Sequence, residues 1–61
     1  MAHYRLYILD DKGHIARSLN LDCRDDDEAR AVAAEHRRQH DIELWQGDRF
    51  LGAYARGQKP D

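Results

Sequence analysis

Few side chains in this 61-residue sequence have a type and spacing that could support catalysis. Cys23 is the only cysteine, and it comes shortly before the acidic residues 25–28. A thiol beside a helix N-terminus ionises more readily, but the aspartates that follow favour the protonated thiol. No base has a spacing that would activate Cys23 as a nucleophile. We therefore expect Cys23 to be a small buried apolar residue, and we predict no catalytic residue and no enzymatic activity.

The histidines are the second group with chemical potential. His36 and His40 are four residues apart, so on a helix they would share one side and could chelate a metal ion. The available further ligands are His3, His14 and Asp41, and the spacing favours none of them. We therefore predict neither a metal site nor a cofactor, with His36 at the edge of the core and His40 near the helix end.

These residues depend on a helix predicted over residues 25–40. Asp25 is a suitable N-cap, and Glu28 three residues later completes a capping box. Acidic side chains in the first turn and basic ones in the last turn match the helix dipole. The acidic run lacks the glycine and alternating ligands of a calcium loop, so we interpret it as a cap. Small side chains form one narrow face at helical spacing, namely Ala29, Val32, Ala33 and His36.

A first strand is predicted over residues 3–9, because its side chains alternate between two faces. One face carries Tyr4, Leu6 and Ile8, and the other carries Arg5, Tyr7 and Leu9. Both faces are largely apolar, which is unusual for a sheet with one side in water. Residues 10–13, Asp-Asp-Lys-Gly, then predict a type I turn, with Gly13 as the left-handed residue of a bulged hairpin.

A second strand follows over roughly residues 14–23. The bulged turn would set Leu9 opposite Ile15 and Tyr7 opposite Arg17. We expect one face of this strand to carry Arg17 together with its apolar residues, Ile15, Leu19, Leu21 and Cys23.

The last two strands form a tight hairpin. Residues 41–46 are the third strand, and the central Gly47-Asp48 pair suits a type II′ turn. The implied pairing sets Leu44 opposite Leu51 and Ile42 opposite Ala53 on an aliphatic face. On the second face, Trp45 falls opposite Phe50, with Tyr54 further along.

The predicted fold class is therefore α+β, with the element order β-β-α-β-β. A crossover through the helix gives a four-stranded antiparallel sheet in the order 2-1-3-4, with the helix on one face. Residues 1–55 form a single small domain, and residues 56–61 are expected to be a flexible tail because they have nothing to bury.

Size and charge narrow the class of protein. A chain this short buries only about 60% of the surface that it exposes when unfolded, so we expect oligomerisation to stabilise it. The net charge of −2 argues against a nucleic-acid partner. No apolar run approaches the ~20 residues that span a membrane, and the N-terminus lacks the pattern of a signal peptide. With its lone cysteine, the protein is expected in the cytoplasm.

The second face of the predicted sheet is the remaining candidate site. Contiguous exposed aromatic residues mark an interaction surface. We expect this face to form a homodimer, or to bind another protein, so that the chain is a non-catalytic protein-interaction or accessory module. The alternative is that the face stacks on the bases of single-stranded nucleic acid. The predicted surface comprises Arg5, Tyr7, Trp45, Phe50 and Tyr54.

Over residues 3–51 the chain resembles short bacterial proteins of β-β-α-β type that have no assigned activity. The resemblance lies in Tyr-Arg-Leu-Tyr at residues 4–7, in Asp-Asp-Lys-Gly-His-Ile at 10–15, in the acidic helix start and in Glu-Leu-Trp at 43–45. It implies the same fold and transfers no catalytic residue. The order of strand, Asp-x-x-Gly turn, strand and helix is also similar to HicB-like antitoxins, which implies an antitoxin-like regulator as a further alternative.

Overall fold

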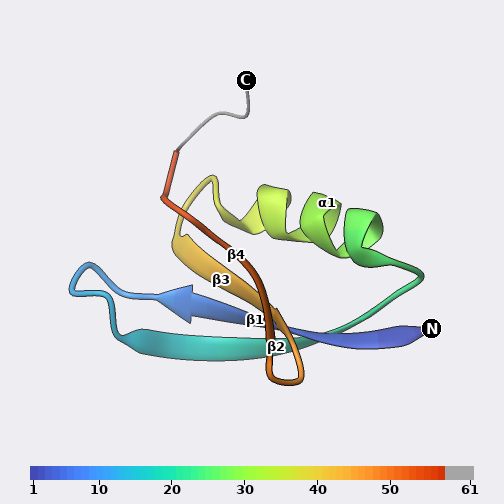
Figure 1. Cartoon of the computed structure of the whole chain (residues 1–61). Coiled ribbons are helices and arrows are strands. Elements are labelled where there is room, and N and C mark those ends of the chain that lie inside the picture. The colour runs from blue at the N-terminus through green and yellow to red at the C-terminus, as the bar shows by residue number, and fades with distance from the viewer. Residues whose placement is uncertain (58–61) are drawn as a thin grey trace.

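The computed structural model describes residues 1–57, which form two layers (Figure 1). The elements are β1 (Ala2–Leu9), β2 (Ile15–Cys23), α1 (Asp26–His36), β3 (Asp41–Gln46) and β4 (Arg49–Tyr54). All paired strands are antiparallel, and the sheet order is β2-β1-β3-β4. The predicted α+β class, element order and strand order are confirmed. Figure 1 shows α1 over one face of the sheet, and no element of residues 1–57 covers the other face.

The β1–β2 turn is held by its first residue. The Asp10 carboxylate accepts hydrogen bonds from the backbone N–H groups of Lys12 and His14, each at 2.9 Å. Gly13 has a φ of +83°, a conformation that costs a residue with a Cβ atom free energy. The Gly13 N–H donates to the Asp10 carbonyl at 3.0 Å, which closes the turn.

The register of β1 and β2 shifts by one residue after the pair nearest the turn. Leu9 lies opposite Ile15 as predicted, but Ile8 lies opposite Arg17, so Ala16 is an extra residue in β2. The prediction of Tyr7 opposite Arg17 is therefore wrong, since Tyr7 lies opposite Ser18. An extra residue exchanges the two faces of a strand at that point.

The faces of β2 differ from the prediction in consequence. Arg17 lies on the helix side with Leu19, Leu21 and Cys23, as predicted. Ile15 does not share that face, because it pairs with Leu9 on the opposite side, where it is 58% exposed.

The helix begins where the sequence indicates and ends early. The Asp25 carboxylate accepts from the Glu28 N–H at 2.9 Å, as expected of an N-cap. The Glu28 carboxylate accepts from the Arg24 N–H at 3.0 Å, one residue before the partner expected in a capping box. The helix ends at His36, four residues before the predicted end, and Arg37 is its C-cap. The prediction that the basic residues after His36 form the last helical turn is therefore wrong.

The core lies between α1 and the sheet. Ala29 and Ala33 are fully buried, so the small face of the helix lies close to the strands as the pattern indicates. The sheet contributes three strands of buried side chains, with Leu21, Leu19, Leu51, Tyr54 and Val32 packed around them. The buried sheet residues are Tyr4, Leu6, Ile8, Cys23, Ile42 and Leu44.

The β3–β4 hairpin keeps its predicted turn and changes its register beyond it. Gly47 has a φ of +60°, as the first central residue of a type II′ turn requires. Trp45 lies opposite Phe50 as predicted, but a register shift follows, so that Leu44 faces Gly52 and Ile42 faces Tyr54. The predicted pairs of these two residues with Leu51 and Ala53 are wrong by one position, because Leu51 is an extra residue that packs against the core.

Two residues of the predicted tail donate hydrogen bonds from their backbone N–H groups. The Arg56 N–H donates to the Asp41 carboxylate at 2.6 Å, and the Gly57 N–H donates to the Arg37 carbonyl at 2.9 Å. These bonds connect the end of β4 with the segment between α1 and β3. The rest of the predicted tail, residues 58–61, lies outside the described residues.

Candidate interaction surface

The uncovered side of the sheet, here called the open face, consists of aligned rows across all four strands. In the central row Asn20 lies opposite Arg5, Arg5 opposite Trp45, and Trp45 opposite Phe50. In the next row Ser18 lies opposite Tyr7, Tyr7 opposite Glu43, and Glu43 opposite Ala53. Residues paired in this way present their side chains on the same face. The open face is defined by these two rows, Asn20, Arg5, Trp45 and Phe50 with Ser18, Tyr7, Glu43 and Ala53.

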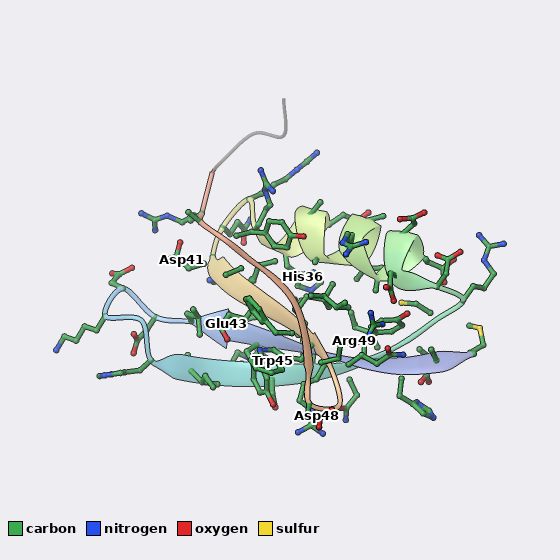
Figure 2. All side chains as sticks on the ribbon, in the orientation of Figure 1. His36, Asp41, Glu43, Trp45, Asp48 and Arg49 are labelled. Carbon is green, nitrogen blue, oxygen red and sulfur yellow. The ribbon has the colours of Figure 1, made fainter. Side chains whose placement is uncertain are left out.

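Two aromatic rings occupy the centre and one end of the central row. The Trp45 and Phe50 ring centroids are 5.0 Å apart, with an angle of 52° between the ring planes. Such tilted contacts add to the stability of a cross-strand pair. The Trp45 indole N–H donates to the Glu43 carboxylate at 3.1 Å, which fixes the ring on the surface. Figure 2 shows Trp45 and Glu43 side by side on β3.

Phe50 is the more exposed residue of this aromatic pair. Its side chain is 52% exposed, although a phenyl ring gains free energy when it leaves water. Trp45 and Tyr7 are half-buried. The open face therefore has a central aromatic cluster that water reaches.

The other end of the central row is polar and hollowed. The Arg5 Nε–H donates to the Asn20 side-chain carbonyl at 3.2 Å. A shallow hollow of about 380 Å³ lies beside these two residues, and Tyr7 also lines it. The bond to Asn20 orients the guanidinium and leaves its terminal nitrogens available to a partner.

Four of the five residues predicted for this surface lie on it, and Tyr54 does not. Tyr54 pairs with Ile42 and packs against the core on the helix side, since the extra residue Leu51 reverses its direction. The Arg37 guanidinium carbon lies 5.3 Å from the Tyr54 ring centroid. A Cβ atom on Gly52 would lie 2.9 Å from the Tyr54 hydroxyl, so the ring covers the backbone of this glycine.

The polar partners that hold the surface in place were not predicted from the sequence. Asn20 and Glu43 orient Arg5 and Trp45 through the hydrogen bonds described above. The signal for Glu43 was its spacing of two residues from Trp45 on one strand, which puts both side chains on one face. No comparable signal identified Asn20, because its position opposite Arg5 depends on the extra residue Ala16.

A second polar cluster, also missed, lies on the helix side at the start of α1. Asp26 accepts two hydrogen bonds from the Arg49 guanidinium, at 2.9 and 3.1 Å, and one from the Tyr4 hydroxyl at 2.7 Å. Arg49 also binds the Gln46 side chain, and Figure 2 shows Arg49 between the hairpin and α1. The signal was present, because the hairpin pairing of Gln46 with Arg49 already placed Arg49 on the Leu44 face.

This cluster shifts the proton equilibria of its members. Hydrogen bonds from Arg49 and then Tyr4 lower the pKa of Asp26. The hydrogen bond to Asp26, with burial and the negative charge of that carboxylate, raises the pKa of Tyr4 to about 12. Asp26 is thus ionised and Tyr4 protonated at neutral pH. Through these bonds the cluster joins the start of α1 to β1 and to the β3–β4 hairpin.

Cys23 is 3% exposed and packs in the core. Burial raises the pKa of its thiol, and the nearby carboxylates of Glu28, Asp22 and Asp25 raise it further. Both effects favour the thiol over the thiolate that a nucleophile requires.

His36 and His40, whose spacing would allow a helix to chelate a metal ion, are not on one helix. α1 ends at His36, and His40 follows the turn after it. His36 Nδ1 lies 3.3 Å from the Val32 carbonyl oxygen, and Figure 2 shows the ring between α1 and the sheet. Among residues 1–57, no group of three or more histidine, cysteine, aspartate or glutamate side chains is arranged to hold a metal ion.

In the described part of the chain, α1 is neither long nor apolar enough to cross a membrane. Comparison of the chain with protein-family models, with curated proteins and with solved structures finds no match.

Proposed function

We propose that this protein is a small protein-interaction module whose open face forms a homodimer. The single observation that carries the proposal is the exposed central row of Asn20, Arg5, Trp45 and Phe50, which crosses all four strands. Apolar patches of this kind on small domains mark interaction sites. α1 covers one face of the sheet only, so a partner is needed to remove the aromatic cluster from water.

The central row is complementary to its own reversed copy. A two-fold axis parallel to the strands, midway between β1 and β3, sets Arg5 against the partner's Trp45, and Asn20 against the partner's Phe50. A guanidinium over an indole ring is a favourable cation–π contact. Phe50 would enter the hollow of about 380 Å³ that Arg5, Tyr7 and Asn20 line on the partner. Packed sheets differ in strand direction by about 30°, which keeps central rows in contact.

The next row is complementary under the same operation. Tyr7 comes to lie against the partner's Glu43, whose carboxylate already accepts from Trp45 and has a second oxygen for the tyrosine hydroxyl. Ser18 comes to lie against the partner's Ala53, where a small side chain leaves space. No like charges meet in either row, which favours this partner over an arbitrary surface.

The size of the open face suits a dimer. The Cα atoms extend over 31 × 25 × 15 Å, and the short dimension corresponds to the two layers. The broad side is therefore on the order of 600–800 Å², close to the share that each partner contributes to a standard interface.

The charge of the surface favours protein over nucleic acid as the partner. Arg5 is the one arginine in its two rows, and Glu43 lies among the aromatics. Asp22 and Asp41, paired with His3 and Leu9 on the same side of the sheet, add two carboxylates. A face that binds single strands requires a basic groove along the phosphates, so base stacking is the weaker alternative.

Thermal unfolding at different protein concentrations tests the proposal. If folding is coupled to dimerisation, the midpoint rises with concentration by mass action. Trp45→Ala should remove this dependence, because the indole is the centre of the proposed contact. Tyr54→Leu is the matched control: it removes an aromatic ring from the helix side, so it should lower the midpoint and keep the dependence. A wild-type midpoint that stays constant over a hundredfold range of concentration contradicts the homodimer.

A further inference from the structure

The two edges of the sheet are protected to different degrees. β4 is a short edge strand with an extra residue at Leu51 and a glycine at position 52. β2, the other edge, is nine residues long and contains neither proline nor lysine. Long edge strands without such devices present unpaired backbone groups that another strand can bind. β2 has such devices only towards its ends, with the extra residue Ala16 and the charged Arg17 at one end and Asp22 near the other, and residues 18–21 between them carry none.

A groove runs beside this edge on the helix side. Its volume is about 430 Å³, with Ile8, Leu19 and Arg17 contributed by the sheet. Its other wall is the end of α1 and the following turn, which contribute Glu35, His36, Gln39 and His40. A strand added to β2 would direct alternate side chains into this groove, because side chains of neighbouring strands alternate in step.

On the helix side, the β2 edge carries both apolar and charged side chains. Leu19 and Leu21 are only half-buried, although both lie on the helix side of the sheet. Arg17 is exposed and takes part in none of the ion pairs of the described residues. Added side chains would therefore meet two incompletely covered leucines and, two residues further along, the Arg17 guanidinium, which has no ion pair among the described residues although Glu35 lines the same groove.

We propose that β2 captures an extended segment of another protein as an additional antiparallel strand. Residues directly opposite each other in an antiparallel pair present their side chains on the same side of the sheet, which determines the sequence pattern of that segment. Apolar side chains lie opposite Leu21 and Leu19, and an acidic side chain lies opposite Arg17. From its N-terminus the partner segment therefore has the pattern apolar-x-apolar-x-acidic. The backbone edge of β2 and its helix-side residues are separate from Ser18 and Asn20, the residues that β2 contributes to the open face, so capture is independent of the proposed homodimer.

A second copy of β2 fits this edge less well. The only acidic residue of β2 is Asp22, and it pairs with His3 on the open side of the sheet, whereas Arg17 lies on the helix side. When two copies of β2 pair with their helices on the same side, no register sets Asp22 opposite Arg17. When Leu19 lies opposite the copy's Leu19, for example, Arg17 lies opposite the copy's Leu21. The charge of Arg17 thus favours a different, acidic segment.

A peptide titration of the isotope-labelled protein tests the proposal. The probe is Ser-Val-Thr-Val-Thr-Glu-Ser, and the matched control has lysine in place of glutamate. The amide signals of residues 15–23 and of the end of α1 should shift with the glutamate peptide, with an affinity roughly fivefold higher than for the lysine peptide. Methylation of alternate peptide nitrogens should abolish binding, because it removes the donors of the added strand.

The variant Arg17→Glu decides the role of charge, since this exposed position tolerates substitution without loss of the core. Its preference should reverse, so that the lysine peptide binds more tightly. The proposal is overturned if β2 signals do not shift at millimolar peptide, if the two peptides bind equally, or if Arg17→Glu keeps the wild-type preference. It is also overturned if the β2 signals of the Trp45→Ala variant, which should not dimerise through the open face, shift with protein concentration alone, because a second copy would then occupy the edge.

Discussion

Asp26, the first residue of α1, binds Arg49, the first residue of β4, through two hydrogen bonds of 2.9 and 3.1 Å. This contact joins the start of the helix to the last hairpin. Phe50 follows Arg49 directly and points to the other side of the sheet. The ion pair on the covered side therefore fixes the strand position from which Phe50 reaches the open face.

The variant Asp26→Asn should lose part of the acid sensitivity of the fold. The folded protein lowers the pKa of Asp26 below its ordinary value of 3.8. This carboxylate thus stabilises the fold above the ordinary pKa, and the contribution is lost as pH falls through the lowered pKa. Urea unfolding from pH 7 to pH 2 measures it. The free energy of unfolding of Asp26→Asn should be lower at pH 7 and should decrease less in acid.

Asp48→Asn provides the control for this measurement, because Asp48 is exposed and lies next to Arg49 in the chain. It should keep the acid profile of the wild type. An Asp26→Asn variant with an unchanged profile would show that the ion pair contributes nothing to stability.

Tyr4 should ionise well above the ordinary pH range of a tyrosine. Its pKa is raised from 10.0 to about 12, first of all by the hydrogen bond to Asp26. This raised pKa stabilises the fold fully below pH 10, and the contribution is lost as pH rises through about 12. Phenolate absorbance during a base titration reports it. Tyr4→Phe should remove the transition near pH 12, and a wild-type titration without that transition would contradict the raised pKa of Tyr4.

Local signals in the sequence predicted most of the fold. Asp25 caps the helix, Gly13 and Gly47 occupy left-handed turn positions, and the strand order follows from the element order. These features depend on a few neighbouring residues, so a single sequence contains the information.

The two extra residues could not be predicted in the same way. Ala16 and Leu51 shift their strands by one position, and neither is a glycine or another residue typical of a bulge. Their positions follow from long-range packing, for example of Leu51 against the core. The prediction of the face on which Tyr54 lies was wrong for this reason. Trp45 and Phe50 lie before the shift, so the prediction of their pairing was correct.

Replacement of Asp25 by alanine should cost about 0.5–2 kcal/mol of unfolding free energy, because the Glu28 N–H loses its acceptor. Asp27→Ala is the matched control in the same turn. Asp27 is exposed and lies 3.8 Å from Arg30, so its loss should cost well under 1 kcal/mol. Chemical unfolding of both variants gives the comparison. Equal costs would mean that charge near the helix dipole, and not the cap, accounts for the effect of Asp25.

A chelator should leave the thermal stability of the protein unchanged. His36 lines the groove beside β2 with His40, and no described arrangement supplies them with a third ligand. Thermal unfolding with and without a strong chelator checks the prediction. A decrease of several degrees that added zinc reverses would contradict it and would indicate a metal site at these two histidines.

Sedimentation equilibrium of the wild-type protein measures whether the chain forms the proposed homodimer. A large aromatic side chain buried at an interface contributes on the order of 2–3 kcal/mol to association. A two-fold dimer buries Trp45 of both copies, so the Trp45→Ala variant should associate far more weakly than the wild type. The wild type should have twice the chain mass of 7.1 kDa, and Trp45→Ala should have the mass of one chain at the same concentration. A wild-type protein that keeps the mass of one chain up to high micromolar concentration would contradict the homodimer.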